Sequence, residues 1–455
     1  MKRTATAKIL MQAAFAVMFA SQALCQTNAS AYFLEGSFDR YRLNSAFSPE
    51  RAFLALPVLG GTEMNAGMNA GLADFIFESK TNPGKLTTFM SSEISADRFL
   101  NGLPDMFSTD FRFGTDVLAF GFGKEKWYAW FDSRIVAGAR FAIPKEMFSF
   151  MKAGFSRGEY EISGVGATLN SYLETSVGFQ YEPVDNLRVG ASLKPLWGLA
   201  YVDASIDRLY ANTAGSSWMI MADASVRNGI PMMEVVLEDG KISDVRRSDS
   251  KFQMNPLSGF AFDFGAEYNF DRLVPGLTVS ASISDIGSIR WDGIQILGTD
   301  ADESAEFRGF LPDGSADEFA DDLKDLLVLH ETGKSRVTQK LDATFRAGVE
   351  YTLPFLDCLS VGELFTRYGG DINMSESLTS LNLSLFKFLE LSGNVAFSDK
   401  GCCFGGMVNL HPAGINFFLA TDFRRIELNP QMIPLDGFDA DFRMGVRLAL
   451  SSLRF

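Results

Sequence analysis

The chain has 455 residues, of which 47% are hydrophobic and 13% aromatic, and its formal net charge is −15. This negative charge excludes nucleic acid as a partner, because phosphates bind lysine and arginine. Beyond the N-terminal stretch, no apolar run reaches the about 20 residues of a membrane-spanning helix, so the apolar side chains must lie on many shorter elements.

The N-terminal stretch up to Cys25 has the pattern of a signal peptide. It begins with basic residues, continues through an apolar run over residues 9–20, and offers a cleavage position at residues 23–25. The run is too short to span a bilayer. We expect residues 1–25 to be removed on export, which leaves Gln26 as the first mature residue. Lipidation of Cys25 is the alternative, and Leu24 disfavours it because a small residue normally occupies that position.

From Met64 onward, apolar and polar residues alternate with a period of two. In the last such segment, Phe442 and Met444 share one face, and Arg443 and Arg447 share the other. This period is typical of β-strands. The segments extend over about 10 to 17 residues, against about 5 or 6 in soluble sheets and about 9 to 11 in membrane barrels. A face that carries arginine does not fit a dry core, so a wall between lipid and water is indicated.

About fourteen segments show this pattern, an even number as single-chain barrels require. They begin near Met64, Arg112, Lys126, Ala167, Leu187, Gly259, Gly276, Lys340, Asp357, Met374, Phe388, Cys403, Gly414 and Asp439. Short and long connections alternate between most of them, which is typical of barrels with short periplasmic turns and long outer loops. In lipid every backbone N–H and C=O must be paired, so the sheet must close. We therefore predict an all-β fold, a transmembrane antiparallel barrel of about 14 strands over residues 64–455, with both termini in the periplasm.

Three regions depart from this simple pattern. Residues 112–123 are apolar on both faces, and residues 203–258 are long enough to contain an additional hairpin at Met233–Ile242. Asp300–Asp325 holds ten acidic and two basic residues. We interpret this acidic segment as a solvated outer loop rather than a calcium site. A capping-box pattern within it predicts a short helix over Ala316–Leu329.

Charged residues on the polar face of the predicted strands are expected to line the lumen. They are Asp132, Arg134, Arg140, Asp263, Glu267, Asp342, Arg346, Glu350, Glu390, Arg443 and Arg447. Their mixed sign leaves two interpretations, a path for a solute or a neutralised network that fills a plugged lumen. Mixed sign favours the network, since selective pores usually carry one dominant sign.

Pro195 interrupts the strand that begins at Leu187. Proline lacks the N–H that a sheet ladder requires, so it is normally found at strand edges, ends or bulges. We interpret Pro195 as a candidate defect in the hydrogen-bonded ladder of the wall. A position near a strand end or bulge is the alternative.

The chain offers little for catalysis or metal binding. Its two histidines are His330 in a long connection and His411 in a short turn, and neither lies on a predicted wall strand. After the signal peptide, Cys358, Cys402 and Cys403 lack the spacing of metal ligands. We predict no enzymatic activity, no catalytic residue, no metal site and no cofactor.

Residues 26–63, before the first predicted strand, lack amphipathic periodicity and contain the run Asn44-Ser45-Ala46-Phe47-Ser48-Pro49-Glu50-Arg51. This run resembles the Asn-Pro-Ala-Phe-x-Pro-Glu-Arg motif of an uncharacterised family of outer-membrane proteins from Bacteroidetes within the FadL-like superfamily. The resemblance implies that residues 26–63 form a plug in the lumen, with Asn44, Ala46, Phe47 and Pro49 as its motif. Ser45 replaces the motif's proline, which removes the residue that would make the turn rigid.

The same superfamily includes long-chain fatty-acid transporters and the PorV-type shuttle proteins of type IX secretion. The resemblance therefore implies one of two functions. One is the binding or transport of a hydrophobic small molecule, with sideways release through a strand defect such as that at Pro195. The other is a non-transporting barrel whose outer loops bind secreted proteins. A soluble exported β-protein is a third interpretation. We expect a monomer in outer-membrane lipid, with a hydrophobic ligand or a secreted protein as its partner.

Overall fold

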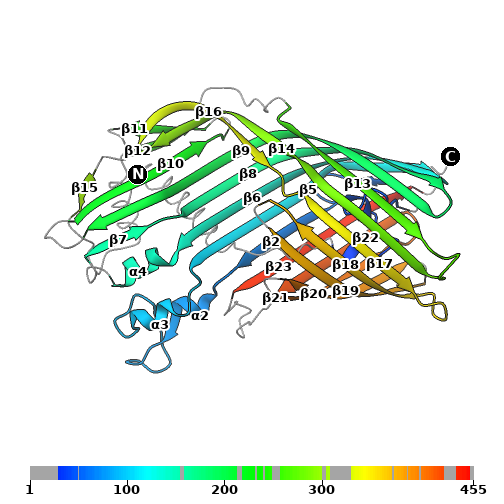
Figure 1. Ribbon diagram of the computed structural model, residues 1–455, viewed down its shortest axis with the longest axis horizontal. Coiled ribbons are helices and arrows are strands. Elements are labelled where there is room, and N and C mark those ends of the chain that lie inside the picture. Colours follow the sequence, from blue (N-terminus) through cyan, green and yellow to red (C-terminus); the bar gives the residue numbers. More distant parts are fainter. Residues whose placement is uncertain are drawn as a thin grey trace.

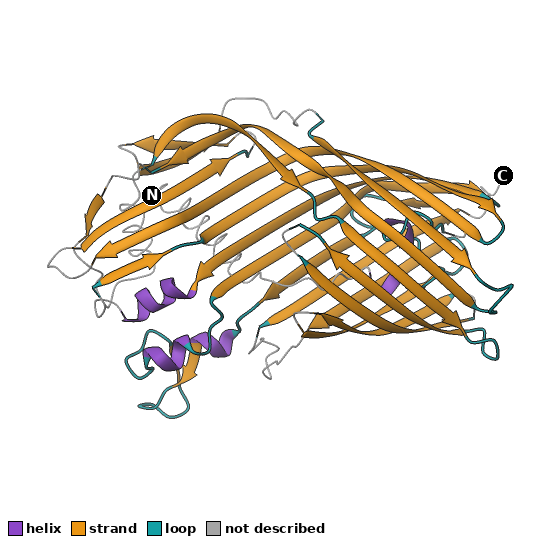
Figure 2. Ribbon diagram, viewed as in Figure 1, coloured by secondary structure: helices purple, strands orange, loops and turns teal. Residues whose placement is uncertain are grey.

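The computed structural model describes residues 29–49, 51–153, 158–212, 218–230, 233–238, 241–247, 257–299, 304–307, 329–370, 373–386, 388–398, 401–424 and 437–450. Most of these residues lie in β-strands (Figure 2). Among them, no helix has the length and apolar character to cross a membrane. The predicted helix Ala316–Leu329 and most of the acidic segment lie outside the described residues.

The strands fall into wall, rim and separate pairs. The wall contains β1 (Ala52–Ala55), β2 (Thr62–Met68), β5 (Met106–Lys124), β6 (Trp127–Pro144), β8 (Val165–Val184), β9 (Leu187–Asn212), β10 (Trp218–Asn228), β13 (Gly259–Asn269), β14 (Leu277–Gly298), β16 (His330–Lys340), β17 (Thr344–Thr352), β18 (Leu359–Tyr368), β19 (Met374–Leu385), β20 (Leu389–Ser398), β21 (Gly401–Leu410), β22 (Ile415–Arg424) and β23 (Phe438–Leu450). The rim strands are β7 (Glu159–Ile162) and β15 (Ser304–Phe307). The separate pairs are β3 (Ile76–Glu78) with β4 (Leu86–Thr88) and β11 (Met233–Glu238) with β12 (Lys241–Arg247). The helices are α2 (Leu72–Phe75), α3 (Ala96–Leu100) and α4 (Lys145–Ala153), and the 3-10 turns η1 (Ala29–Ala31) and η2 (Arg40–Arg42) precede β1.

The wall strands form one antiparallel sheet that closes on itself. Three wall positions are each shared by two strands, namely β1 with β2, β10 with β13, and β16 with β17. The ring has 14 positions, and β23 closes it against β1 and β2. This confirms the predicted barrel of about 14 strands, whose predicted starts lie within or beside the observed strands.

The two faces of the wall differ in polarity as the alternation predicts. On the outside, Phe345, Leu381 and Phe397 are between 42% and 61% exposed. On the inside, Thr366 and Asn382 are 1% and 3% exposed. Lipid solvates the apolar exterior, and closure of the sheet satisfies the backbone. The protein is therefore an outer-membrane β-barrel.

One side of the barrel is taller than the other (Figure 1). The strands β8, β9 and β14 have 20, 26 and 22 residues, whereas β18, β20 and β22 have 10 each. A bilayer requires only about 9 to 11 residues, so the long strands continue beyond it on the side of the long connections. The prediction of a loop from residue 203 to 258 is therefore wrong in part, because β9 continues into it and β10 lies within it. The additional hairpin predicted there is confirmed as β11 and β12.

The N-terminal segment contributes to the wall as well as to the lumen. The short strand β1 lies within residues 26–63 and pairs with β23 and β5, so the wall begins at Ala52 rather than near Met64. β1 has four residues, which are too few for an alternation of apolar and polar residues to be recognised in the sequence. Between β1 and β2 the chain leaves the ladder, and Val58 and Leu59 are 61% and 64% exposed.

Candidate functional site: the lumenal chamber and its plug

One cavity occupies the lumen on the side of the long connections, and we call it the chamber. Its volume is about 350 Å³. Wall strands from β2 to β17 supply most of its lining, and Tyr41, Arg42 and Leu43 of the N-terminal segment supply the rest. Residues 29–49, which we call the plug, therefore form the floor of the chamber.

The plug is packed tightly inside the barrel. Tyr32, Leu34, Ala46 and Phe47 are at most 2% exposed, and the rings of Tyr32 and Phe47 meet edge to face at 5.0 Å. The plug core is continuous with apolar residues on the inner wall, including Leu364. The plug therefore packs against the inner wall through buried apolar side chains.

Glycines on the inner face of the wall make room for the plug. A Cβ at Gly348 would lie 2.6 Å from the ring of Tyr32, and one at Gly362 would overlap the ring of Phe33. A Cβ at Gly265 would overlap Asn44. Because these positions lack a side chain, the plug approaches the backbone of the wall closely.

Asn44 holds the turn in which the motif's proline is replaced by Ser45. Its Oδ1 accepts a hydrogen bond from the N–H of Ala46 at 2.9 Å, which is the geometry of an Asx turn. Its Nδ2 donates to the carbonyls of Ala266 and Ala281 on the wall, at 3.4 and 3.3 Å. The side chain of Asn44 therefore both shapes the plug and attaches it to β13 and β14.

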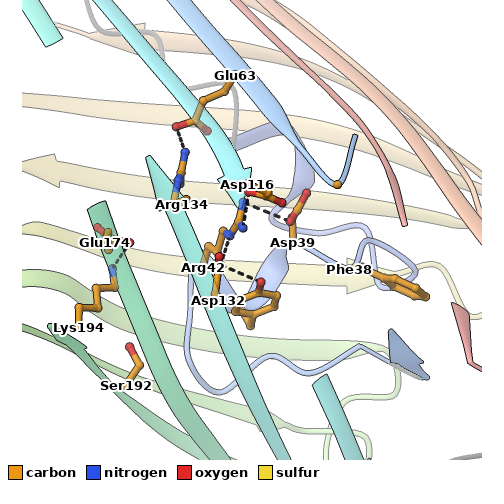
Figure 3. A network of polar contacts seen from close by, with 12 residues as sticks. Phe38, Asp39, Arg42, Glu63, Asp116, Asp132, Arg134, Glu174, Ser192 and Lys194 are labelled. Atoms are coloured by element: carbon orange, nitrogen blue, oxygen red, sulfur yellow. Dashed lines mark hydrogen bonds and ion pairs between the residues drawn. The ribbon is translucent and has the colours of Figure 1, made fainter. Parts of the chain in front are cut away.

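Ion pairs join the plug to β5 and β6 (Figure 3). The Arg42 guanidinium lies 2.7 Å from Oδ1 of Asp116 and 2.5 Å from Oδ2 of Asp132. The hydroxyl of Tyr41 donates to Asp132 at 2.9 Å. Burial raises the pKa of Tyr41, so this hydroxyl stays protonated and remains a donor.

A second set of ion pairs joins the plug to the last strand. Asp39 lies 3.0 Å from Nη2 of Arg443 and also pairs with Arg447, both on β23. Neither carboxylate oxygen of Asp39 accepts an aligned hydrogen bond from the described residues. The contacts of Asp39 with the two arginines are therefore electrostatic. Arg447 is fully buried, lies 3.1 Å from Asp116, and donates to the carbonyl of Phe38 at 3.0 Å. Through these residues the plug bridges β23 and β5, the strands on either side of β1.

Three carboxylates share one ammonium on another part of the chamber wall. Nζ of Lys194 lies 2.7 Å from Asp285, 2.8 Å from Asp263 and 3.9 Å from Glu174. The hydroxyl of Ser192 donates to Asp263 at 2.7 Å. This group ties together β8, β9, β13 and β14 at the level of Pro195.

The predicted lumen-lining residues divide into two groups. Those in the chamber lining are Asp132, Arg134, Arg140, Asp263, Asp342 and Arg346. The others are Glu267, Glu350, Glu390, Arg443 and Arg447, which bind the plug or a neighbouring wall residue. Most of the eleven contact an opposite charge, as Arg134 does with Glu63, and this supports the interpretation as a neutralised network.

Sequence reasoning missed several partners of these residues. Asp39 and Arg42 lie in a segment without periodicity, and Asp116 lies where both faces are apolar, so no local pattern marks them. Lys194 and Glu174 do lie on polar faces of their strands, and their alternation with apolar neighbours was a usable signal.

The wall has irregular pairing around Pro195. On one side Pro195 pairs with Phe260 of β13. On the other side the ladder between β8 and β9 includes Glu174 with Leu196 and resumes only at Val177. The position opposite Pro195 is unpaired because proline has no N–H to donate. That this irregularity serves as an exit stays a prediction.

Next to Pro195, the wall position between β9 and β14 is occupied by β13 along one part of its length and by β10 along the other. β10 ends at Asn228 and β13 begins at Gly259, and the described strands between them, β11 and β12, form a separate sheet. On the inner face at this height lies a buried group that we call the apolar cluster, with Leu196, Tyr201, Ile289, Trp291 and Ile294 as its members.

No group of three or more histidine, cysteine or acidic side chains suited to a metal ion occurs among the described residues. His330 begins β16 and is exposed, and His411 directly follows β21, with its Nε2 3.9 Å from Glu390. The two histidines therefore belong to opposite ends of the barrel.

Comparison with known proteins gives a family and distant structural likenesses. No curated protein matches the chain. The toluene transporter TodX of Pseudomonas putida is 9% identical over 96% of each chain, with a TM-score of 0.41. A Pseudomonas aeruginosa FadL homologue is 11% identical over 94% of this chain and 96% of its own, also with a TM-score of 0.41. The model of a family of unknown function, DUF5723, matches residues 46–422, and the chain therefore belongs to the DUF5723 family.

Proposed function

We propose that this protein is a plugged outer-membrane channel that binds and transports a hydrophobic small molecule. The observation that carries the proposal is the interruption of the wall between β10 and β13, which lies beside the apolar cluster. Among the described residues, backbone hydrogen bonds that bridge the interruption include Gly229 to Tyr201 and Ser258 to Leu196, both at 2.7 Å. In this part of the described chain, the sheet ladder is therefore interrupted where the inner face of the wall is apolar.

The apolar cluster is continuous with the chamber. Tyr172 and Leu341 line the chamber and also pack against the cluster. The plug closes the direct path to the periplasm, and charged side chains occupy much of the remaining chamber wall. An apolar molecule avoids dehydrating those charges if it moves along Tyr172 and Leu341 toward the interruption. Pro195, adjacent to Leu196, weakens the same region and fits a sideways exit.

Accumulation of a hydrophobic dye tests the proposal. Cells that carry the protein in their outer membrane should take up N-phenyl-1-naphthylamine faster than cells without it. Leu341→Asp, which places a carboxylate on the route, should slow this uptake several-fold. Leu273→Asp is the matched control, because Leu273 lies in a short turn and is 78% exposed. Equal dye uptake with and without the protein would contradict the proposal.

The alternative function is a barrel that presents its outer loops to secreted proteins. The loops that would make such contacts lie largely outside the described residues, and no described contact favours that function.

A further inference from the structure

A second cavity lies at the opposite end of the barrel from the chamber, and we call it the periplasmic pocket. Its volume is about 390 Å³, and it opens between the underside of the plug and the turn that joins β5 to β6. Short turns mark this end as the periplasmic one. Ser48, Pro49 and Arg51 line it, so the second half of the plug motif faces this pocket.

Among the described residues, the lining of the periplasmic pocket holds more cationic than acidic side chains, although the net charge of the whole chain is −15. Four cationic side chains contribute to it, from Arg40, Arg51, Lys124 and Arg188. The carboxylates of Glu35 and Glu125 are the acidic side chains of the described lining. Low-dielectric walls concentrate the field of such a group, so the pocket attracts anions.

Two of the four cations already have partners. The Arg188 guanidinium lies 3.1 Å from Glu267. Arg40 donates from Nε to the carbonyl of Tyr32 at 2.9 Å, and its guanidinium lies 4.1 Å from the ring centre of Phe47.

The other two cations are Arg51 and Lys124, and neither forms an ion pair with any described residue. Arg51 directly precedes β1 and Lys124 is the last residue of β5, and these two strands pair with each other. The Tyr128 hydroxyl donates to the carbonyl of Arg51 at 3.1 Å, which fixes the backbone of Arg51 against the wall. Gln180, which is 4% exposed, and Trp127 add polar side chains to the same lining.

We propose that the periplasmic pocket binds a small anion bearing a carboxylate or phosphate group, held between Arg51 and Lys124. Arginine forms paired hydrogen bonds with either group, and lysine adds a point charge. Because Arg51 directly precedes β1 and Lys124 ends β5, and these two strands pair with each other, the bound anion bridges the periplasmic ends of β1 and β5. This site is independent of the hydrophobic route, which lies on the other side of the plug.

Calorimetric titration of the refolded full chain in a zwitterionic detergent tests the proposal. Citrate and inorganic phosphate serve as probes, and chloride at matched ionic strength serves as the reference. We expect saturable binding at one site per chain. The double variant Arg51→Gln, Lys124→Gln should bind the anion at least about tenfold more weakly. Lys126→Gln is the matched control, because it removes a cation two residues from Lys124, in the β5–β6 turn, without touching the pocket lining.

Each outcome decides the matter. Saturation by citrate alone assigns a carboxylate ligand, saturation by phosphate alone assigns a phosphate ligand, and saturation by both assigns either oxyanion. A response no different from that of chloride overturns the proposal, as does an equal loss of binding in Lys126→Gln. Heat-dependent migration on SDS gels shows whether each variant is folded, so loss of binding is separated from loss of structure.

Discussion

At the scale of single residues, the attachment of the plug to the wall depends on buried charged side chains, each of which has few oppositely charged neighbours. Asp39 is 2% exposed and faces both Arg443 and Arg447. A buried ion pair adds little net stability, because removing charges from water costs about as much as the pairing returns. Removal of one partner is different, since it leaves the other charge buried without compensation.

Asp39→Asn should therefore destabilise the protein by about 3–5 kcal/mol, although it conserves the shape of the side chain. Among the described residues, the fully buried Arg447 would keep Asp116 as its acidic neighbour. Urea unfolding of the refolded protein in lipid vesicles measures the change. Asp185→Asn is the control, because Asp185 pairs with Lys126 and Arg272 at an exposed turn and should contribute less than about 1 kcal/mol. A similar effect of the two substitutions would show that the plug does not depend on Asp39.

At the scale of elements, the wall strands alternate faces regularly, and their irregularities are concentrated on one side. The ladder between β8 and β9 is interrupted opposite Pro195, and the register between β13 and β14 shifts between Phe262 and Phe264. Asp285, on β14 beside this shift, has a positive φ of 61°. These features surround Lys194, so a charged group and a weakened wall occupy the same place.

Pro195→Val should strengthen this part of the wall, because valine supplies the missing N–H and favours strand geometry. We expect a higher unfolding temperature together with slower uptake of the hydrophobic dye. Pro183→Val is the control, since Pro183 lies near the end of β8 at a short turn. Unchanged uptake in a more stable Pro195→Val protein would separate Pro195 from the transport route.

At the scale of the whole molecule, the closed ring makes the lipid a required solvent. Leu381, at the middle of β19, is 54% exposed on the outer face, as are aromatic residues on the neighbouring strands. In water, a charged substitution at such an exposed position costs little stability. In a bilayer, an outward-facing charged side chain must lose its hydration.

Leu381→Arg should therefore cost about 2–4 kcal/mol of folding free energy in lipid vesicles. Leu381→Ala gives the part of this cost that comes from lost apolar area alone. Urea titration of both variants measures the difference. A cost of Leu381→Arg below about 0.5 kcal/mol, the usual range for surface substitutions in soluble proteins, would favour a soluble β-protein instead.

The barrel architecture was predictable because its signals are local. A period of two is visible within each strand, as in Phe442 to Arg447, and the alternation of short and long connections sets which end faces the periplasm. The extra height of β9 was missed because the polarity pattern weakens once a strand leaves the bilayer and water contacts both faces.

By itself, then, the sequence determined the all-β class, the strand number and the polarity of the two faces. Only the tertiary structure decided which charges meet. Asp39 and Arg447 come from opposite ends of the chain, and Lys194 meets Asp285 through strands on either side of β13. It also decided that β10 and β13 share one wall position, which creates the interruption beside the apolar cluster. The physical reason is that periodicity reports the environment of each residue, whereas the identity of a distant partner depends on how the ring closes around the plug.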